Sequence, residues 1–213
     1  MSARVKICGL TTPESMEAAL DAGADYVGLV FYPASPRHIE FKVARELAAM
    51  ASGTADLVAL VVDPSNRLIG EIASEIGPDF IQLHGAESPD RVVEIAELSQ
   101  ARTIKALGVT DHADIAVADS YIGVADLIMF DAKPPPNSSI PGGNGIAFDW
   151  SVLHSVRPGL DYMLSGGLTP ENVGEAIRQT GAPAVDVSSG VERSRGVKDA
   201  ALIRAFIEAA KSV

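Results

Sequence analysis

The chain has 213 residues, 47% hydrophobic and 21% charged, which is the profile of a globular protein that can bury one core without disulfides or structural metals. Its formal charge of −11 at pH 7 provides no basic stripe, so neither nucleic acid nor an anionic membrane is an expected partner, although a local pocket could still hold a small anionic substrate. The single cysteine, Cys8, excludes an intrachain disulfide and a thiolate metal cluster; together with the lack of a signal peptide or of roughly 20 consecutive apolar residues, it favours a cytoplasmic protein.

Short β-branched runs alternate with amphipathic stretches along the whole chain. Strands are predicted to begin near Arg4, Tyr26, Leu57, Phe80, Thr103, Asp126, Tyr162 and Ala184. Helical spacing is clearest at Thr12–Ala22, Ser65–Ile76, Ser88–Leu98, Pro170–Thr180 and Lys198–Lys211. Eight such units predict an α/β protein with a parallel (β/α)8 TIM barrel over residues 1–213 as a single compact domain. A doubly wound open sheet is the alternative.

One connection is unusually long. The segment 132–147, AKPPPNSSIPGGNGIA, joins the sixth strand to the sixth helix without a helical or strand pattern of its own. Loops of this length in compact domains are often lids over active sites, but a tolerated surface insertion explains the composition equally well.

Polar side chains gather where the predicted strands end, which is where barrels of this kind carry their functional groups. Alternation along the strands places Lys6 and Cys8 on the barrel side of the first strand, Gln82 and His84 on that of the fourth, and Asp131 at the end of the sixth. Taken singly, each is weakly informative: a lone cysteine is usually an inert core residue, a strand-end aspartate is often a helix cap, and a histidine before glycine often belongs to a turn. A potential base and a potential acid at the same end favour a catalytic site.

The fifth strand supplies a further candidate. Thr103, Lys105 and Leu107 share one face, and we expect that face to point into the barrel, with Lys105 slightly below the mouth as Lys6 is.

Glycine-rich turns follow the seventh and eighth strands, at SGGL (165–168) and VSSGVE (187–192). Such turns let backbone N–H groups approach a phosphate, usually beside a short helix. Their occurrence at both positions indicates a phosphorylated small-molecule ligand.

In order and spacing, several segments resemble the phosphoribosylanthranilate isomerase family. They are KICGLT (6–11), GADYVGLVFYPASPRHI (23–39), FIQLHG (80–85), FDAKPP and PGGNG around Asp131, SGGLTPENV (165–173) and DVSSGVE (186–192). The match runs from Val5 to about Asp199, and Asn144 departs from it where threonine or serine is common.

The resemblance implies a cofactor-free and metal-free Amadori rearrangement of an aminoaldose phosphate in tryptophan biosynthesis. The residues matching the family's general base and general acid are Cys8 and Asp131, and Arg37 is expected near the anthranilate carboxylate, although a surface ion pair would also explain an arginine there. The glycine-rich turns would hold the phosphate. The candidate substrate-binding residues are thus Arg37, Gln82, His84, Gly143, Gly145, Gly166, Gly167, Ser188, Ser189 and Gly190.

The chemistry fits these residue types. A carboxylic acid at Asp131 could protonate the furanose oxygen, and a thiolate at Cys8 could remove the C2 proton. A free thiol has a pKa of about 8.5, so Cys8 needs either a lowered pKa or a minor thiolate population, and Lys6 is a candidate to favour the thiolate.

Other barrel enzymes fit less well. A metal-dependent pentose-phosphate epimerase needs His and Asp ligands on several strand ends, whereas only His84 is so placed. The isomerase of histidine biosynthesis resembles a two-aspartate design, and indole-glycerol-phosphate synthase usually carries an N-terminal extension. A non-catalytic phosphate-binding barrel is the alternative of a different class. Either a monomer or a homodimer is compatible with the sequence.

Overall fold

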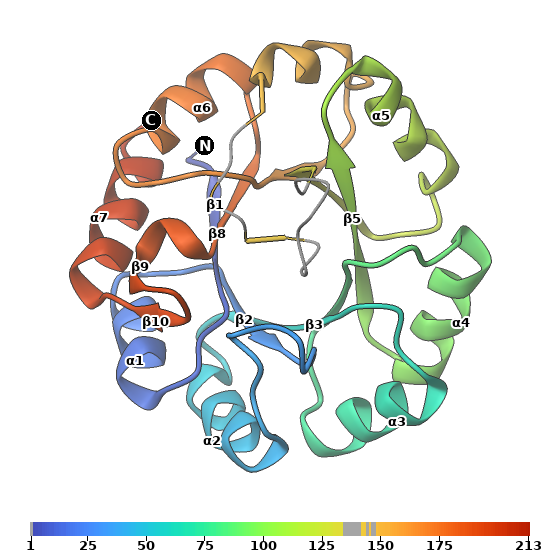
Figure 1. Cartoon of the computed structure of the whole chain (residues 1–213), viewed down its shortest axis with the longest axis vertical. Coiled ribbons are helices and arrows are strands. Elements are labelled where there is room, and N and C mark those ends of the chain that lie inside the picture. The colour runs from blue at the N-terminus through green and yellow to red at the C-terminus, as the bar shows by residue number, and fades with distance from the viewer. Residues whose placement is uncertain (1, 134–141, 144, 146–147) are drawn as a thin grey trace.

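The computed structural model describes residues 2–133, 142–143, 145 and 148–213. Eight parallel strands form a closed barrel in sequence order, with β1 paired to both β2 and β8 (Figure 1). The strands are β1 (Arg4–Cys8), β2 (Tyr26–Val30), β3 (Asp56–Val61), β4 (Phe80–Leu83), β5 (Arg102–Val109), β6 (Leu127–Ala132), β7 (Tyr162–Leu164) and β8 (Ala184–Val187). The predicted TIM barrel and the eight predicted strand positions are confirmed, and the open sheet is excluded.

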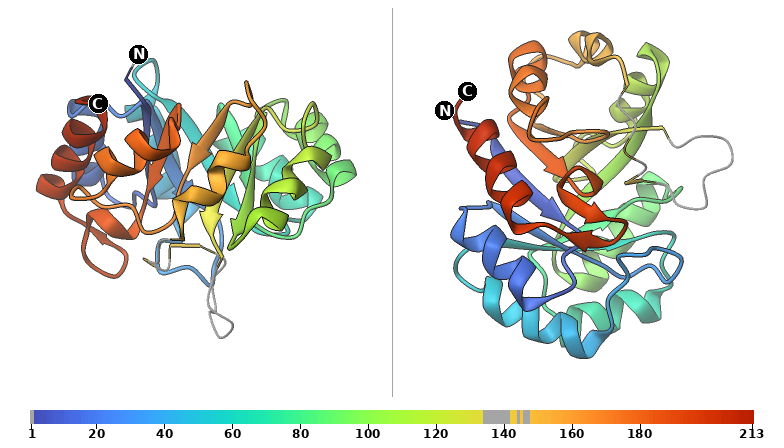
Figure 2. Two further views of the ribbon diagram at one scale, coloured as in Figure 1. Left: turned by 90° about the horizontal axis from the view of Figure 1, so that it is seen from above. Right: turned by 60° about the vertical axis from the view of Figure 1, so that its left-hand side comes forward.

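Helices surround the barrel (Figures 1 and 2). They are α1 (Pro13–Asp21), α2 (Phe41–Ala51), α3 (Asn66–Glu75), α4 (Pro89–Ser99), α5 (His112–Ala116), α6 (Val173–Thr180) and α7 (Ala200–Lys211). Thr12, Ser65, Ser88 and Asp199 cap their helices by accepting backbone N–H hydrogen bonds, as residues of these types do. No described helix is long and apolar enough to cross a membrane.

The helical segment that follows β6 on the outside of the barrel differs from the prediction. The sixth helix is replaced by a 3₁₀ helix, η2 (Trp150–Ser155), and α5 is followed by a second one, η1 (Val117–Ser120). Asp149 caps η2 through the Ser151 N–H group, and Pro158, which favours an extended residue before it, follows soon after. These two residues confine the helical segment to the stretch between them.

Two apolar layers hold the barrel together. The inner one fills the lower barrel with Tyr26, Val58, Phe80, Ile104, Ala106, Leu127, Met129, Met163 and Ala184. The outer layer lies between strands and helices and includes Val5, Ile7, Ile81 and Leu83, as strand alternation predicts. Because these apolar side chains fill the lower barrel, the cavity described below is confined to the C-terminal ends of the strands.

A small hairpin extends the chain beyond β8. The 3₁₀ helix η3 (Ser189–Val191) leads into β9 (Glu192–Ser194), which pairs antiparallel with β10 (Val197–Lys198). This hairpin precedes α7 and lies on the same side of the barrel as α1 (Figure 1).

Candidate active site

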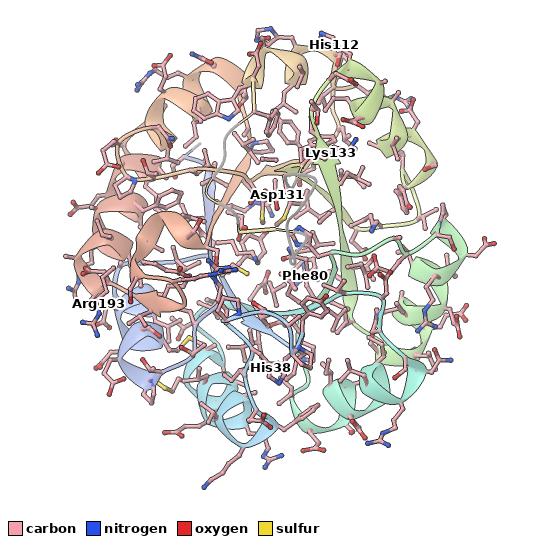
Figure 3. The ribbon with its side chains drawn as sticks, viewed as in Figure 1. His38, Phe80, His112, Asp131, Lys133 and Arg193 are labelled. Carbon is pink, nitrogen blue, oxygen red and sulfur yellow. The ribbon has the colours of Figure 1, made fainter. Side chains whose placement is uncertain are left out.

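A cavity opens at the C-terminal ends of the strands. Side chains from β1, β4, β6 and β8 line it, together with the loops after β2, β6, β7 and β8. Figure 3 looks along the barrel and shows Asp131 near its centre. Most predicted site residues line this cavity: Cys8, Arg37, Gln82, His84, Asp131, Gly143, Gly145, Gly166, Gly167, Ser188 and Ser189.

Cys8 lies at the end of β1 in a buried group of polar side chains. Lys6, two residues earlier on the same face, donates to Asp186 Oδ1 at 2.7 Å, and Ser165 donates to Asp186 Oδ2 at 3.0 Å. Gly28 on β2 leaves room for the thiol, because a Cβ there would stand 3.0 Å from Cys8 Sγ and 3.3 Å from Lys6 Nζ. Asp186 was not singled out from the sequence, yet it is the buried counterion of Lys6.

Burial and charge act in opposite directions on this group. Burial raises the pKa of the Cys8 thiol, and the nearby Lys6 ammonium only partly offsets this. Burial disfavours the charge of Lys6, but Asp186 and Cys8 outweigh it and raise the pKa of that ammonium. The structure therefore provides no lowered pKa for Cys8, and a minor thiolate population beside a permanent cation is the form that fits.

Asp131 ends β6 and faces a hydrogen-bonded chain from β4. His84 Nε2 lies 3.1 Å from Asp131 Oδ2, and the Gln82 amide nitrogen lies 3.1 Å from His84 Nδ1. With Nδ1 accepting from the amide, Nε2 carries the ring hydrogen and donates it to Asp131. The backbone N–H of Ala132 donates to the other carboxylate oxygen at 2.8 Å. Gly142 packs over the pair, since a Cβ there would lie 2.7 Å from both Asp131 Oδ2 and His84 Nε2.

Arg37 is buried, so the alternative of a surface ion pair is wrong. It is only 4% exposed and lines the cavity. Its Nε donates to Glu192 Oε1 at 2.7 Å and its Nη2 to Glu192 Oε2 at 3.1 Å. The sequence places Glu192 in the motif after β8 but predicts no role for it.

The glycine-rich turns converge on the cavity from β7 and β8. Gly166 and Gly167 have φ of +90° and +64°, which glycine adopts without strain. Ser189 opens η3, so backbone N–H groups are available beside it. Gly190 does not line the cavity: a Cβ there would lie 1.9 Å from the Leu168 carbonyl oxygen, so this glycine allows the two turns to pack together.

The prediction for Lys105 was wrong. Ile104 and Ala106 point into the barrel, so Lys105 lies on the outer face of β5. Its ammonium donates to Glu87 Oε2 and to the Gly85 carbonyl, both at 2.7 Å, between sheet and helices. Lys6 is thus the lysine that approaches the cavity from within the barrel.

The long loop after β6 is described only in part. Gly142, Gly143 and Gly145 line the cavity, whereas residues 134–141, 144 and 146–147, including Asn144, lie outside the described residues. The lid prediction therefore stays a prediction. Within the described part of the chain, no three His, Cys, Asp or Glu side chains are grouped so that they could hold a metal ion.

Comparisons with known proteins agree with this geometry. The family model described as N-(5′-phosphoribosyl)anthranilate isomerase matches residues 5–209. An N-(5′-phosphoribosyl)anthranilate isomerase of Afipia carboxidovorans is 52% identical over 212 residues, which cover 100% of this chain and 91% of that protein.

Two solved structures resemble the fold closely. One is of monomers generated from the dimeric phosphoribosylanthranilate isomerase of Thermotoga maritima, with a TM-score of 0.84 and 37% identity over 99% of this chain and 100% of that one. The other is a phosphoribosylanthranilate isomerase in complex with reduced 1-(o-carboxyphenylamino)-1-deoxyribulose 5-phosphate, with a TM-score of 0.84 and 36% identity at the same coverage.

Proposed function

The chain belongs to the N-(5′-phosphoribosyl)anthranilate isomerase family, and we propose that it isomerises N-(5′-phosphoribosyl)anthranilate in tryptophan biosynthesis with Cys8 as general base and Asp131 as general acid. The observation that carries the proposal is the opening of both side chains into one cavity from β1 and β6. A base and an acid on separate strands can act on two different atoms of one sugar.

The first step is opening of the furanose ring. Asp131 in its protonated form gives a proton to the ring oxygen, the C1–O bond breaks, and the anthranilate nitrogen forms a protonated Schiff base with C1. His84 Nε2, 3.1 Å from Asp131 Oδ2, supports the proposal because this contact fixes the orientation of the Asp131 carboxyl group at the cavity.

The second step is proton removal from C2. The Cys8 thiolate takes this proton, and the electrons of the C2–H bond form an enaminol with C1, neutralising the iminium nitrogen. Loss of the C2 hydroxyl proton and protonation of C1 then give the ketose, so the product is an isomer and no redox partner is consumed. The charge of Lys6 favours the thiolate at the moment of transfer.

Two anionic groups orient the substrate in this proposal. The phosphate lies against Gly166, Gly167, Ser188 and Ser189, where backbone N–H groups and hydroxyls can surround it. The anthranilate carboxylate lies against Arg37, whose guanidinium can bind both carboxylate oxygens.

The proposal is tested by following the loss of anthranilate–sugar fluorescence with substrate made in situ. Cys8→Ala and Asp131→Asn should each lower kcat by about 10²- to 10⁴-fold, the usual contribution of one general acid or base. Asp161→Asn is the matched control, because Asp161 pairs with Arg4 on the surface, at 60% side-chain exposure. Full activity in either test variant would remove that residue from its role, and wild type without turnover above the spontaneous rate would favour a non-catalytic phosphate-binding barrel.

A further inference from the structure

Glu192 forms a buried bidentate pair with Arg37. The two hydrogen bonds of 2.7 and 3.1 Å join two nitrogens of the guanidinium to the two carboxylate oxygens, and both side chains are at most 5% exposed. A guanidinium held in this way has a fixed plane, unlike one held by a single bond.

The Glu192 carboxylate is itself held from two further directions. Lys198, on the other strand of the hairpin, donates to Oε1 at 2.9 Å, and the Gly196 N–H donates to Oε2 at 3.0 Å. Lys198 also donates to the Ser188 carbonyl at 2.8 Å, beside the turn assigned to the phosphate. Burial disfavours the carboxylate, but the hydrogen bond from Arg37, the charge of Lys198 and the Gly196 N–H outweigh it and lower the pKa of Glu192 to about 2. Glu192 is therefore a charged and immobile anchor.

The pairing determines which part of Arg37 faces a ligand. With Nε and Nη2 on Glu192, Nη1 has no hydrogen-bond partner among the described residues and lies against Gly143, where a Cβ would stand 2.5 Å away. Arg37 and Gly143 line both the cavity that contains Cys8 and Asp131 and a second hollow beside it. Two cationic side chains share one carboxylate, which leaves positive charge for an anionic ligand.

We infer that Glu192 is a positioning residue that fixes Arg37 for a carboxylate on the aromatic ring of the substrate, and so sets selectivity for a carboxylated arylamine. This inference rests on the proposed function. It assigns the β9–β10 hairpin the role of supporting the aryl-acid end of the site, whereas the turns after β7 and β8 serve the phosphate. Preorganisation of this kind strengthens binding because the Arg37 side chain loses its conformational entropy on folding and not on ligand binding.

The test compares two ligands that differ only in the carboxylate. The first is reduced 1-(o-carboxyphenylamino)-1-deoxyribulose 5-phosphate, and the second is the same compound with an unsubstituted phenyl ring. Calorimetry gives Kd for each with wild type, Glu192→Gln, Glu192→Asp and the control Glu208→Gln, an exposed change on α7. Glu192→Asp keeps the charge for Lys198 but is one methylene too short for the bidentate pair, so it remains informative if Glu192→Gln folds poorly.

We expect both Glu192 variants to weaken the carboxyphenyl ligand at least 10-fold and the phenyl ligand less than 3-fold, with KM raised and kcat nearly unchanged. Equal losses for both ligands would overturn the inference, since they would indicate a collapsed site or an Arg37 that serves the phosphate. Unchanged or tighter binding would overturn it as well, because Glu192 would then merely reduce the charge of Arg37. If wild type does not distinguish the ligands, the inference fails, while turnover in the fluorescence assay still decides the proposed function separately.

Discussion

Acidification from pH 7 to pH 3 should remove much of the stabilisation that Glu192 gives to the fold. Its pKa in the folded protein is about 2, below the ordinary value of 4.5. A group whose pKa is lowered on folding stabilises the protein above its unfolded-state pKa and loses that contribution as the pH falls toward the folded-state value. The relevant window therefore runs from about pH 5 down to about pH 2.

The magnitude follows from the two pKa values. At 1.36 kcal/mol for each pH unit, Glu192 contributes on the order of 3 kcal/mol at pH 7 and on the order of 1.5 kcal/mol at pH 3. The Glu192→Gln variant lacks this titrating carboxylate. The difference in unfolding free energy between wild type and Glu192→Gln should hence shrink by roughly 2 kcal/mol between the two pH values.

Urea unfolding at pH 7 and pH 3 measures this difference. Far-ultraviolet circular dichroism and the fluorescence of Trp150, the single tryptophan, should give coincident transitions before free energies are extracted. Glu208→Gln, on the exposed face of α7, serves as the control. A difference for Glu192→Gln that is equal at both pH values within about 0.5 kcal/mol, well below the effect expected from the linkage relation, would refute the reasoning.

Three further predictions concern the Cys8 thiol and the two buried lysines, Lys6 and Lys105. Because burial raises the pKa of Cys8, the rate at which iodoacetamide alkylates this single cysteine should keep rising with pH between 7 and about 9, and a plateau near neutrality would contradict a raised thiol pKa. Lys6→Met should move that rise to higher pH, since the cation that favours the thiolate is gone; an unchanged pH–rate profile would rule out this role for Lys6. Lys105→Met should instead destabilise the fold by about 3–5 kcal/mol, because Glu87 is left buried without its partner. Urea unfolding measures this loss, and the pH profile of Cys8 alkylation should stay unchanged in this variant.

The barrel could be predicted because its strands and helices have different periodicities. The predicted strand starts agree with the observed ones within about a residue, and alternation orients β1, β4 and β6 correctly because each carries apolar residues on the outer face and polar ones at the top. In β5 both faces are buried, so alternation does not indicate on which face Lys105 lies. Its partner on the outer face, Glu87, comes from the loop after β4, and this contact could not be predicted from β5 alone.

The site could be predicted only in part, for a similar reason. Cys8, His84 and Asp131 lie at strand ends, where topology alone brings them together. Glu192 meets Arg37 only because the hairpin packs against the loop after β2, where Gly196 lies against Pro36, and Glu192 and Arg37 are 155 positions apart. Lys198 in turn reaches Glu192 from the second strand of the hairpin. The one available signal was the presence of Glu192 in the motif after β8, which indicated its place in the chain but not its partner.

The unequal covering of the barrel has a consequence for its local unfolding. β1, which carries Cys8, is backed by the 12-residue α7, whereas β6, which carries Asp131, is followed around the ring by the six-residue η2 and adjoins the five-residue α5. Short 3₁₀ segments have poorer hydrogen-bond geometry and bury less apolar surface, so they open at lower free energy. Amide hydrogens of β6 and its neighbours should thus exchange with solvent sooner than those of β1, so we expect Asp131 to lie on a part of the barrel that opens more readily than the part that carries Cys8.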